Sequence, residues 1–273
     1  MEEEQSMERT NMKSSDIFSK ISLIKRGKRN YYDSNVFSVP EEIDHVIFNE
    51  HALVYLWNDK GVRRVYFAAN DAEALQPLLK EMPSKSGIEI IGKQLNHETE
   101  TVILNAGYRL FETYARASIY NLREDVYKNI PDKYKGIDIW DIIQYAERKH
   151  AQDIYDLLYD TFDPFTSHLP SLDQILEDID HRNVVVVIEN GHVAGFIIFK
   201  VIGRKVYIEQ IINRGRSVYM HALYMGVLEK AMADGINIAY TWVKEGNERA
   251  YALMRRFNYQ WEGIKNFAYR KEQ

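Results

Sequence analysis

A short basic loop stands immediately before a long predicted helix, and its residue types are suited to binding phosphate. The candidate residues are Arg214, Gly215, Arg216, Ser217, Val218 and Tyr219. Successive backbone N–H groups that lead into a helix, with the positive end of the helix dipole behind them, attract an anion. The two guanidinium groups add positive charge, and the serine hydroxyl is a further donor. A solvated turn that only begins the helix is the other interpretation.

The elements around the loop alternate between strand and helix. The chain predicts a strand over 205–212, then the loop, a helix over 218–234 and a strand over 236–243. Upstream it predicts a short strand over 137–142, helices over 146–161 and 171–179, and a hairpin over 184–200 that turns at Asn190 and Gly191. This order indicates an α/β protein of the α+β type, with a mixed sheet.

The last forty residues repeat an earlier part of the chain in degenerate form. An offset of 151 residues carries Asn96 onto Asn247, Gly107 onto Asn258 and Tyr108 onto its own residue type, Tyr259. Each copy predicts a strand, a helix begun by asparagine, a left-handed residue and a tyrosine-rich strand. Chance likeness between two ordinary strand–helix–strand units is the alternative.

The length of 273 residues and the repeat together predict two domains. We expect an extension over 1–29, an N-terminal domain over 30–125, a polar linker over 126–136 and a C-terminal domain over 137–273.

The order of elements over residues 137 to 271 resembles the GNAT N-acetyltransferase superfamily. The residues that carry the resemblance are the loop from Arg214 to Tyr219 and a helix with Asn247, Ala250, Leu253 and Met254 at the family's spacing. The resemblance implies two GNAT-like lobes, each a mostly antiparallel mixed sheet with helices on both faces. Because the N-terminal copy covers only the later part of the fold, that lobe is expected to be truncated.

The resemblance implies acetyl-CoA, or another acyl-CoA, as cofactor. Its phosphates would lie on the loop, and its pantetheine arm would enter between the strands over 205–212 and 236–243. The implied contacts outside the loop are Ile211, Ile212, Asn247, Ala250 and Met254. Ser217 and Tyr219 replace the glycines of the family's loop.

The resemblance also implies acyl transfer from a thioester to an amine, which requires a base. Glu209 lies mid-strand, with Tyr207 and Ile211 on the same face by the period of two, and is the candidate base. Met254 stands where the family has a tyrosine acid, so Tyr251 on the same helix is the candidate acid.

The acceptor amine would belong to a small molecule or an amino terminus. The family builds its acceptor pocket from the segment between its first two helices and its last strands, which here gives Phe162, Asp163, Phe165, His168 and Tyr269. A loop anchored by aromatic residues is the plainer interpretation.

The composition of the chain excludes several kinds of partner and cofactor. A net charge of −5 disfavours nucleic acid as partner, and no apolar run approaches the roughly 20 residues of a membrane helix. The chain has no cysteine, and its histidines show no metal-ligand spacing, so we expect a cytoplasmic protein without a metal. A monomer or a homodimer is expected.

Two further functions stay open. One is a non-catalytic acyl-CoA sensor or interaction module, which the residues at 217, 219 and 254 suggest. The other is a two-lobed aminoacyl transferase acting from aminoacyl-tRNA, against which the acidic charge and the incomplete first lobe argue.

Overall fold

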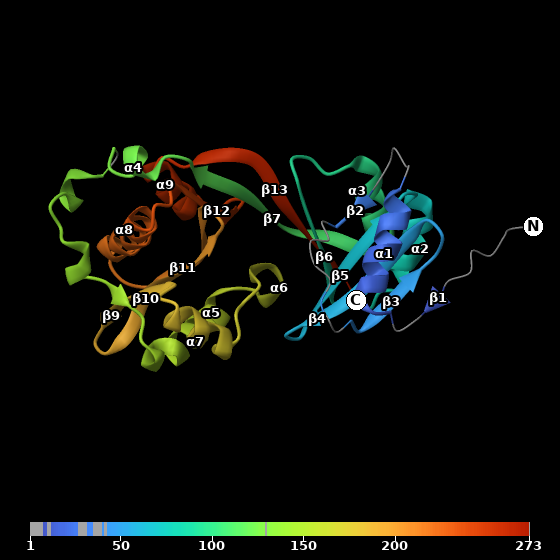
Figure 1. Ribbon diagram of the computed structural model, residues 1–273, viewed down its shortest axis with the longest axis horizontal. Helices are drawn as coiled ribbons and strands as arrows, with labels where there is room; N and C mark the ends of the chain where they lie inside the picture. Colours follow the sequence, from blue (N-terminus) through green and yellow to red (C-terminus); the bar gives the residue numbers. More distant parts are fainter. Residues whose placement is uncertain are drawn as a thin grey trace, which may run out of the picture. The chain divides into compact units, whose positions relative to one another are not determined.

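The structure is a computed structural model that describes residues 8–9, 12–26, 32–34, 40, 43–128 and 130–272. By their contacts the residues divide into two compact units. The N-terminal unit comprises Met1–Tyr114 and Ile264–Gln273, and the C-terminal unit comprises Ala115–Gly263. Figure 1 shows the elements of both units, each of which is a sheet with helices.

The N-terminal unit is a mixed sheet with helices on both faces. Its strands lie in the order β1-β3-β4-β5-β6-β13, with β2 paired to β5, and the β5–β6 pair is parallel. The elements of this unit are β1 (Glu8–Arg9), α1 (Ser14–Lys25), β2 (Tyr32–Asp33), β3 (His45–Phe48), β4 (Ala52–Asp59), β5 (Val62–Ala69), α2 (Ala72–Glu81), β6 (Ser86–Gly92) and α3 (His97–Asn105). Along β4, Leu53 and Tyr55 pack with α1, whereas Val54 packs with α2 on the other face.

The C-terminal unit is a second mixed sheet, and its strands lie in the order β7-β12-β11-β10-β9-β8. One face packs on α5 and α7, and the other packs on α8 and α9. Its elements are α4 (Leu122–Asp125), the 3-10 helices η1 (Asp132–Tyr134), η2 (Ile139–Asp141) and η3 (Arg148–His150), β8 (Gln144–Tyr145), α5 (Ala151–Thr161), α6 (Pro164–Ser167), α7 (Leu172–Asp180), β9 (Val184–Glu189), β10 (His192–Ile202), β11 (Lys205–Asn213), α8 (Ser217–Ala233), β12 (Ile238–Lys244) and α9 (Glu248–Arg256).

Helix α8 is the centre of this unit. Apolar side chains surround it, and Leu223, Tyr224 and Val227 are fully buried. A helix that is apolar on all sides needs partners on all sides, and the sheet, α9 and the segment before β8 supply them. At Gly226 a Cβ would lie 2.2 Å from Cδ1 of Ile143, so glycine permits the close approach of that segment.

The repeated features of the sequence adopt the same local geometry in the two copies. The side chains of Asn96 and Asn247 accept N–H groups in the first turns of α3 and α9, which are nine residues each. Gly107 and Asn258, which follow these helices, have φ of +91° and +61°. The copies therefore share a strand, a capped helix and a left-handed residue.

Two strands begin in one unit and end in the other. Strand β7 (Tyr108–Ile119) starts in the N-terminal unit and ends beside β12, and β13 (Gln260–Lys271) ends in the N-terminal unit. There, residues 265–270 pair antiparallel with residues 87–92 of β6. The division thus differs from the expected domain bounds, because 115–125 belong to the C-terminal unit and 264–273 to the N-terminal one.

The predicted strand over 137–142 was wrong. Gly136 has φ of +75°, and the Asp138 side chain accepts the N–H of Trp140, so this segment forms the turn η2. Only Gln144–Tyr145 pairs with β9. Within the described ranges, the helices are all too short or too polar to cross a membrane.

Candidate active site

Strands β11 and β12 run parallel and then stop pairing, which creates a split in the sheet. Their register begins at Lys205 with Ile238 and ends at Ile208 with Thr241. Both strands continue beyond this point, to Asn213 and Lys244. The Thr241 hydroxyl donates to the Ile208 carbonyl at 2.9 Å, which fixes the last paired position.

A β-bulge lies at the start of the split. Ile198 of β10 pairs with Gln210 and Phe199 pairs with Ile208, so Glu209 is the extra residue of β11. The bulge changes the strict alternation that the sequence suggested. Val206 and Ile208 pack on the α8 side, whereas Ile212 packs on the α5 and α7 side.

Glu209 is half-buried and ion-paired. Its Oε2 lies 3.0 Å from Nζ of Lys200, and its Oε1 accepts from the same group at 3.3 Å. The side chain of Glu209 is 13% exposed and that of Lys200 is 43% exposed. The carboxylate is therefore largely enclosed, with Oε2 buried, and the neighbouring ammonium group compensates its charge.

A hydrogen bond from Gln210 connects the bulge with α6. Its Nε2 donates to the carbonyl of Ser167 at 3.3 Å, and its Oε1 is buried without a hydrogen-bond partner within the described residues. A buried acceptor without a donor is costly, so an N–H group of a bound molecule would be stabilised there. Gln210 was not predicted from the sequence, in which its one distinction is its place next to Glu209.

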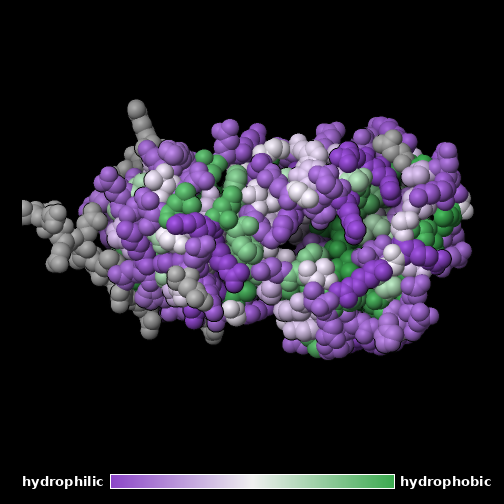
Figure 2. All heavy atoms as spheres, turned by 180° about the vertical axis from the view of Figure 1, so that it is seen from behind, coloured by the Kyte–Doolittle hydropathy of each residue, from purple (hydrophilic) through white to green (hydrophobic). Residues whose placement is uncertain are grey.

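Aromatic side chains of β11 and β12 lie on one face of the sheet, next to the point where the two strands stop pairing. Tyr207 and Tyr240 stack with ring centroids 4.9 Å apart. The Arg116 guanidinium lies 5.9 Å from the Tyr240 ring and 5.8 Å from that of Trp242. We call Tyr207, Tyr240, Trp242 and Arg116 the aromatic shelf. Of these, Tyr207 was expected beside Glu209, and the other three were not predicted from the sequence. On the outer surface of this unit, Figure 2 shows hydrophobic side chains gathered in a hollow between hydrophilic margins.

Glu262 holds Arg116 in place. Arg116 Nε donates to its Oε2 at 2.8 Å, and Ser118 donates to Oε1. Burial raises the pKa of the Glu262 carboxyl, but the hydrogen bonds from Ser118 and Arg116 outweigh burial, so the pKa is lowered overall.

The basic loop binds its own neighbours. Arg214 pairs with Asp160 at the end of α5, and Arg216 donates to the Tyr219 hydroxyl through Nε at 2.9 Å. That hydroxyl in turn donates to Glu189 at 3.0 Å. Tyr219 is 4% exposed and its ring packs on Gly215, where a Cβ would lie 2.5 Å from the ring. The ring therefore points neither outward along α8 nor into the split.

The first turn of α8 lacks a side-chain cap, and Ser217 at its start accepts a hydrogen bond from Tyr134. Its N-cap residue, Arg216, makes no side-chain capping hydrogen bond, and Ser217 is exposed. The N–H of Tyr219 donates to the Arg216 carbonyl at 3.0 Å, whereas the N–H groups before it have no partner within the helix. In the N-terminal unit the corresponding helix, α2, is capped by Asp71, whose carboxylate accepts from Glu73 and Ala74. An anion is therefore favoured at α8 and disfavoured at α2.

Several expected cofactor contacts are core residues. Met254 is 1% exposed and its sulfur lies 3.8 Å from the Tyr224 hydroxyl, and Ile212 is 4% exposed. Neither side chain offers surface to a cofactor, so a contact at these two positions would come from the backbone. Ile211, Val218 and Ala250 are partly buried against the α8 core, and Asn247 caps α9.

The candidate acid, Tyr251, is partly buried on α9. Its ring stacks on that of Trp261, with the centroids 4.4 Å apart. The stacking fixes the ring, and its role as acid stays a prediction.

The expected acceptor residues belong to both units. Tyr269 is fully buried in the core of the N-terminal unit, where its hydroxyl donates to Glu100 at 3.2 Å, so its assignment to the acceptor pocket was wrong. Asp163 caps α6, Phe165 is buried, Phe162 packs beside α5, and His168 is exposed with φ of +46°. The turn around α6 therefore owes its shape to Asp163 and Phe165.

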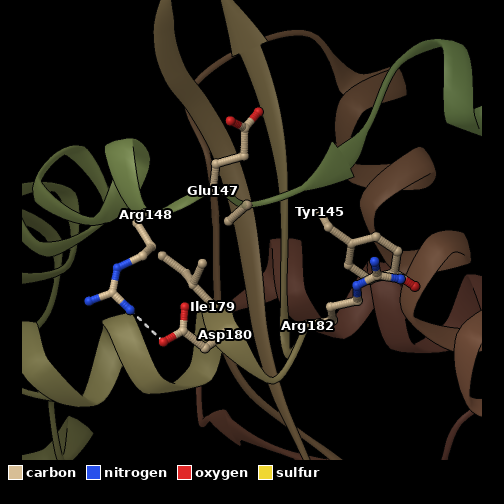
Figure 3. A pocket seen from close by; sticks show the side chains of 7 residues that line it. Tyr145, Glu147, Arg148, Ile179, Asp180 and Arg182 are labelled. Atoms are coloured by element: carbon tan, nitrogen blue, oxygen red, sulfur yellow. Dashed lines mark hydrogen bonds and ion pairs between the residues drawn. The ribbon is translucent and has the colours of Figure 1, made fainter.

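A separate pocket of about 450 Å³ lies at the β8 edge of the sheet. Arg148 pairs with Asp180 across it, and Arg182 lies over the ring of Tyr145 (Figure 3). Strands β9 and β10 separate this edge from β11, so the pocket is distinct from the split.

Comparison with known proteins identifies the class of this fold. The Acetyltransferase (GNAT) family profile matches residues 151–259, and no curated protein sequence matches the chain. Residues 151–259 thus form a domain of the GNAT acetyltransferase family.

Solved structures share the fold at low sequence identity. A GCN5-related N-acetyltransferase from Sphaerobacter thermophilus has a TM-score of 0.59 at 14% identity, covering 97% of this chain and 95% of that one. A GCN5-related N-acetyltransferase from Kribbella flavida has a TM-score of 0.52 at 10% identity, covering 97% and 70%. A fungal GCN5-related glucosamine N-acetyltransferase region has a TM-score of 0.60 at 10% identity, covering 97% of this chain and 38% of that one.

Proposed function

We propose that the C-terminal unit transfers an acyl group from acetyl-CoA, or another acyl-CoA, to an amine. The observation that carries the proposal is the bulge at Glu209 directly beside the point where β11 and β12 stop pairing. A split of this kind exposes backbone N–H and C=O groups on both strands, and the amide-bearing pantetheine arm can pair with them as an added strand does. The family match over 151–259 supports the same activity.

The residues fit the cofactor in two places. The split would receive the pantetheine arm, and the first turn of α8, with Ser217, would receive the diphosphate. When bound, an acyl-CoA supplies a thioester carbonyl that an amine can attack. Arg214 and Arg216 contribute positive charge near the phosphates, although each also holds a partner within the protein.

Glu209 is the proposed base, since its carboxylate lies at the bulge. It accepts the proton that the attacking nitrogen loses, either directly or through one water molecule. Lys200 pairs with the carboxylate and holds it on the side of β10. Gln210 Oε1 is placed to accept an N–H group, which would hold the amine beside Glu209.

The acceptor is a small molecule or an amino terminus that lies over the aromatic shelf. The partly exposed rings of Tyr207, Tyr240 and Trp242 offer a flat apolar surface, and the Arg116–Glu262 pair offers donors and acceptors at its margin. Such a surface suits an amine that is attached to a ring or to an apolar chain.

A non-catalytic acyl-CoA sensor is the second candidate. It is favoured by the internal pairing of both loop arginines and by Met254 at the place of the family's acid. A sensor would bind an acyl-CoA without releasing its thiol.

The deciding experiment measures binding and turnover on the same sample. Thermal unfolding is followed with CoA and with acetyl-CoA, because a ligand at 100 times its Kd adds about 2.7 kcal/mol of stability. Thiol release from acetyl-CoA is then measured with a panel of ring-bearing and aliphatic amines. Binding with amine-dependent thiol release supports the enzyme, binding without release supports the sensor, and no binding refutes both.

A further inference from the structure

One segment of the C-terminal unit crosses the start of α8. Residues 131–137, which we call the strap, lie between two stretches that are anchored in the α8 core by Val126 and by Ile139. Between those anchors, Tyr134 is the one buried side chain among the described residues, with 5% of its surface exposed. Tyr134 is therefore the most deeply buried attachment of the strap, and Ile130, just before the strap, packs partly buried on the α8 core.

Tyr134 occupies a site made by α8 and α9. Its ring stacks on His221 with centroids 4.5 Å apart and planes 13° apart, and the Arg256 guanidinium lies 5.7 Å from the ring. Its hydroxyl lies 3.2 Å from Oγ of Ser217, to which it donates. The phenol thus lies on the first two turns of α8, at the residue that replaces a glycine of the family's phosphate loop.

The other groups of the strap are directed to the strap itself or to solvent. Lys135 pairs with Asp132 at 2.6 Å, and the N–H of Tyr134 donates to the Pro131 carbonyl. Lys133 and Gly136 are exposed, and Gly136 has φ of +75°. Among the residues that the structure describes, no ion pair joins the strap to the rest of the unit.

We propose that the strap closes the α8 end of the cofactor site, and that Tyr134 must leave Ser217 before the diphosphate of CoA can bind there. This inference rests on the proposed function. It follows from competition for one place, because the Ser217 hydroxyl and the N–H groups of an uncapped first turn are what a phosphate would contact. The apparent Kd is then the intrinsic Kd divided by the fraction of molecules in which the strap is open.

Isothermal titration of the full chain with CoA tests the proposal. Tyr134→Phe removes the hydroxyl and keeps the ring, and the loss of one hydrogen bond should tighten CoA binding about fivefold. Tyr134→Ala also removes the ring stacked on His221 and should tighten binding tenfold or more.

Tyr127→Phe is the matched control. Tyr127 lies just before the strap and its hydroxyl donates to Glu229 of the same helix at 3.4 Å, three turns away from Ser217. This variant also loses one tyrosine hydroxyl on α8, and its Kd for CoA should stay within twofold of the unaltered chain.

The outcomes separate this inference from the proposed function. Equal CoA affinity in the unaltered chain and both Tyr134 variants refutes the proposal that the strap must open, and it leaves the proposed cofactor site unaffected. An absence of CoA binding in all of them, with folding verified by circular dichroism, overturns both. Tighter binding in the Tyr134 variants alone supports both.

Limited proteolysis of the unaltered chain gives a second measurement that needs no variant. Trypsin cleaves after Lys133 and Lys135, which are exposed but held in the strap by Tyr134. If the strap opens when CoA binds, CoA should accelerate cleavage at these two positions severalfold. Cleavage that CoA slows or leaves unchanged, at a concentration where binding is measured, refutes the opening.

Discussion

Glu209 and Lys200 form an ion pair between neighbouring strands, with Oε2 of the carboxylate 3.0 Å from Nζ of the ammonium group. The β10–β11 register pairs Lys200 with Tyr207, so the lysine reaches along the sheet to the bulge residue. The charge of Glu209, where the split begins, is therefore balanced by Lys200. The function of Glu209 can be tested by replacing it with glutamine, which has the same shape.

Glu209→Gln should reduce amine-dependent thiol release by about 100-fold or more while the Kd for CoA changes less than twofold. The amide keeps the shape of the side chain but accepts no proton from the amine. Stopped-time thiol assays at saturating acetyl-CoA measure the rate. The control is Glu248→Gln, at an exposed position in the first turn of α9, and it should change neither the rate of thiol release nor the Kd for CoA. An unchanged rate in Glu209→Gln would remove this residue as the base.

Tyr240→Ala should raise the KM for the acceptor about tenfold with little change in kcat. The ring contributes contact area on the aromatic shelf, and such contacts are made equally in the ground state and the transition state. Steady-state kinetics with a ring-bearing amine measure both constants. Tyr155→Ala removes one ring of another stacked pair, Tyr155 and Tyr159 on α5, and should leave the KM unchanged. A fall in kcat alone would contradict the acceptor role of the shelf.

Asn247→Ala and Asn96→Ala form a natural comparison, because the two asparagines cap helices of equal length. Each change should cost about 1 kcal/mol of stability through the lost cap. If Asn247 also contacts the cofactor, its variant alone should bind CoA more weakly, severalfold beyond the control. Urea unfolding and CoA titration of both variants decide this. Equal CoA affinities would mean that Asn247 only caps α9 and does not contact the cofactor.

His221 should make the protein acid-sensitive. Burial and, next, the charge of Arg256 lower the pKa of His221 from 6.5 to about 4. The unfolded chain therefore binds a proton more readily, so this contribution to stability is complete above about pH 6.5 and is lost as the pH falls toward 4. The loss amounts to about 2 to 3 kcal/mol by pH 4.5.

His221→Phe keeps a ring between Tyr134 and Phe257 and removes the titrating group. Between pH 7 and pH 4.5 the variant should lose less unfolding free energy than the unaltered chain, by about the same 2 to 3 kcal/mol. Urea titrations at the two pH values test this. Equal losses would mean that other groups determine the acid sensitivity.

Gly195→Ala should destabilise the protein by about 1 to 3 kcal/mol. A Cβ at Gly195 would lie 2.9 Å from the carbonyl oxygen of Ile212 and 3.3 Å from Cα of Asn213. Because both are backbone atoms, they can move away only by distorting β11. The control is Ala194→Ser, at the partly buried position next to Gly195. Gly246→Ser cannot serve as a control, because the φ of +82° at Gly246 would strain any side chain there. A shift of the unfolding midpoint no larger than that of Ala194→Ser would contradict the expectation.

The features that the sequence predicted correctly are those set by local chemistry. Asparagine before an amphipathic turn predicts a cap, and Gly107 or Asn258 after it predicts a left-handed residue, because these preferences depend on a few neighbouring atoms. The placement of the loop between β11 and α8 was predicted for the same reason.

Features that depend on pairing partners were not accessible from the sequence. The bulge at Glu209 exists only in the register between β10 and β11, and a period of two cannot show it. The direction of Tyr219 depends on Glu189, which is thirty residues away in the sequence. Tyr269 was assigned to the acceptor pocket because it follows β12 and α9 in the chain, whereas its strand ends beside β6.

The late position of β13 in the chain sets an order for biosynthesis. All residues of the C-terminal unit have been translated once Gly263 has been added, whereas the N-terminal unit still awaits the strand that pairs with β6. A nascent N-terminal unit therefore carries an open sheet edge while more than a hundred further residues emerge from the ribosome. Ribosome-bound chains that stop before residue 264 should accordingly depend on chaperones far more than the released protein does.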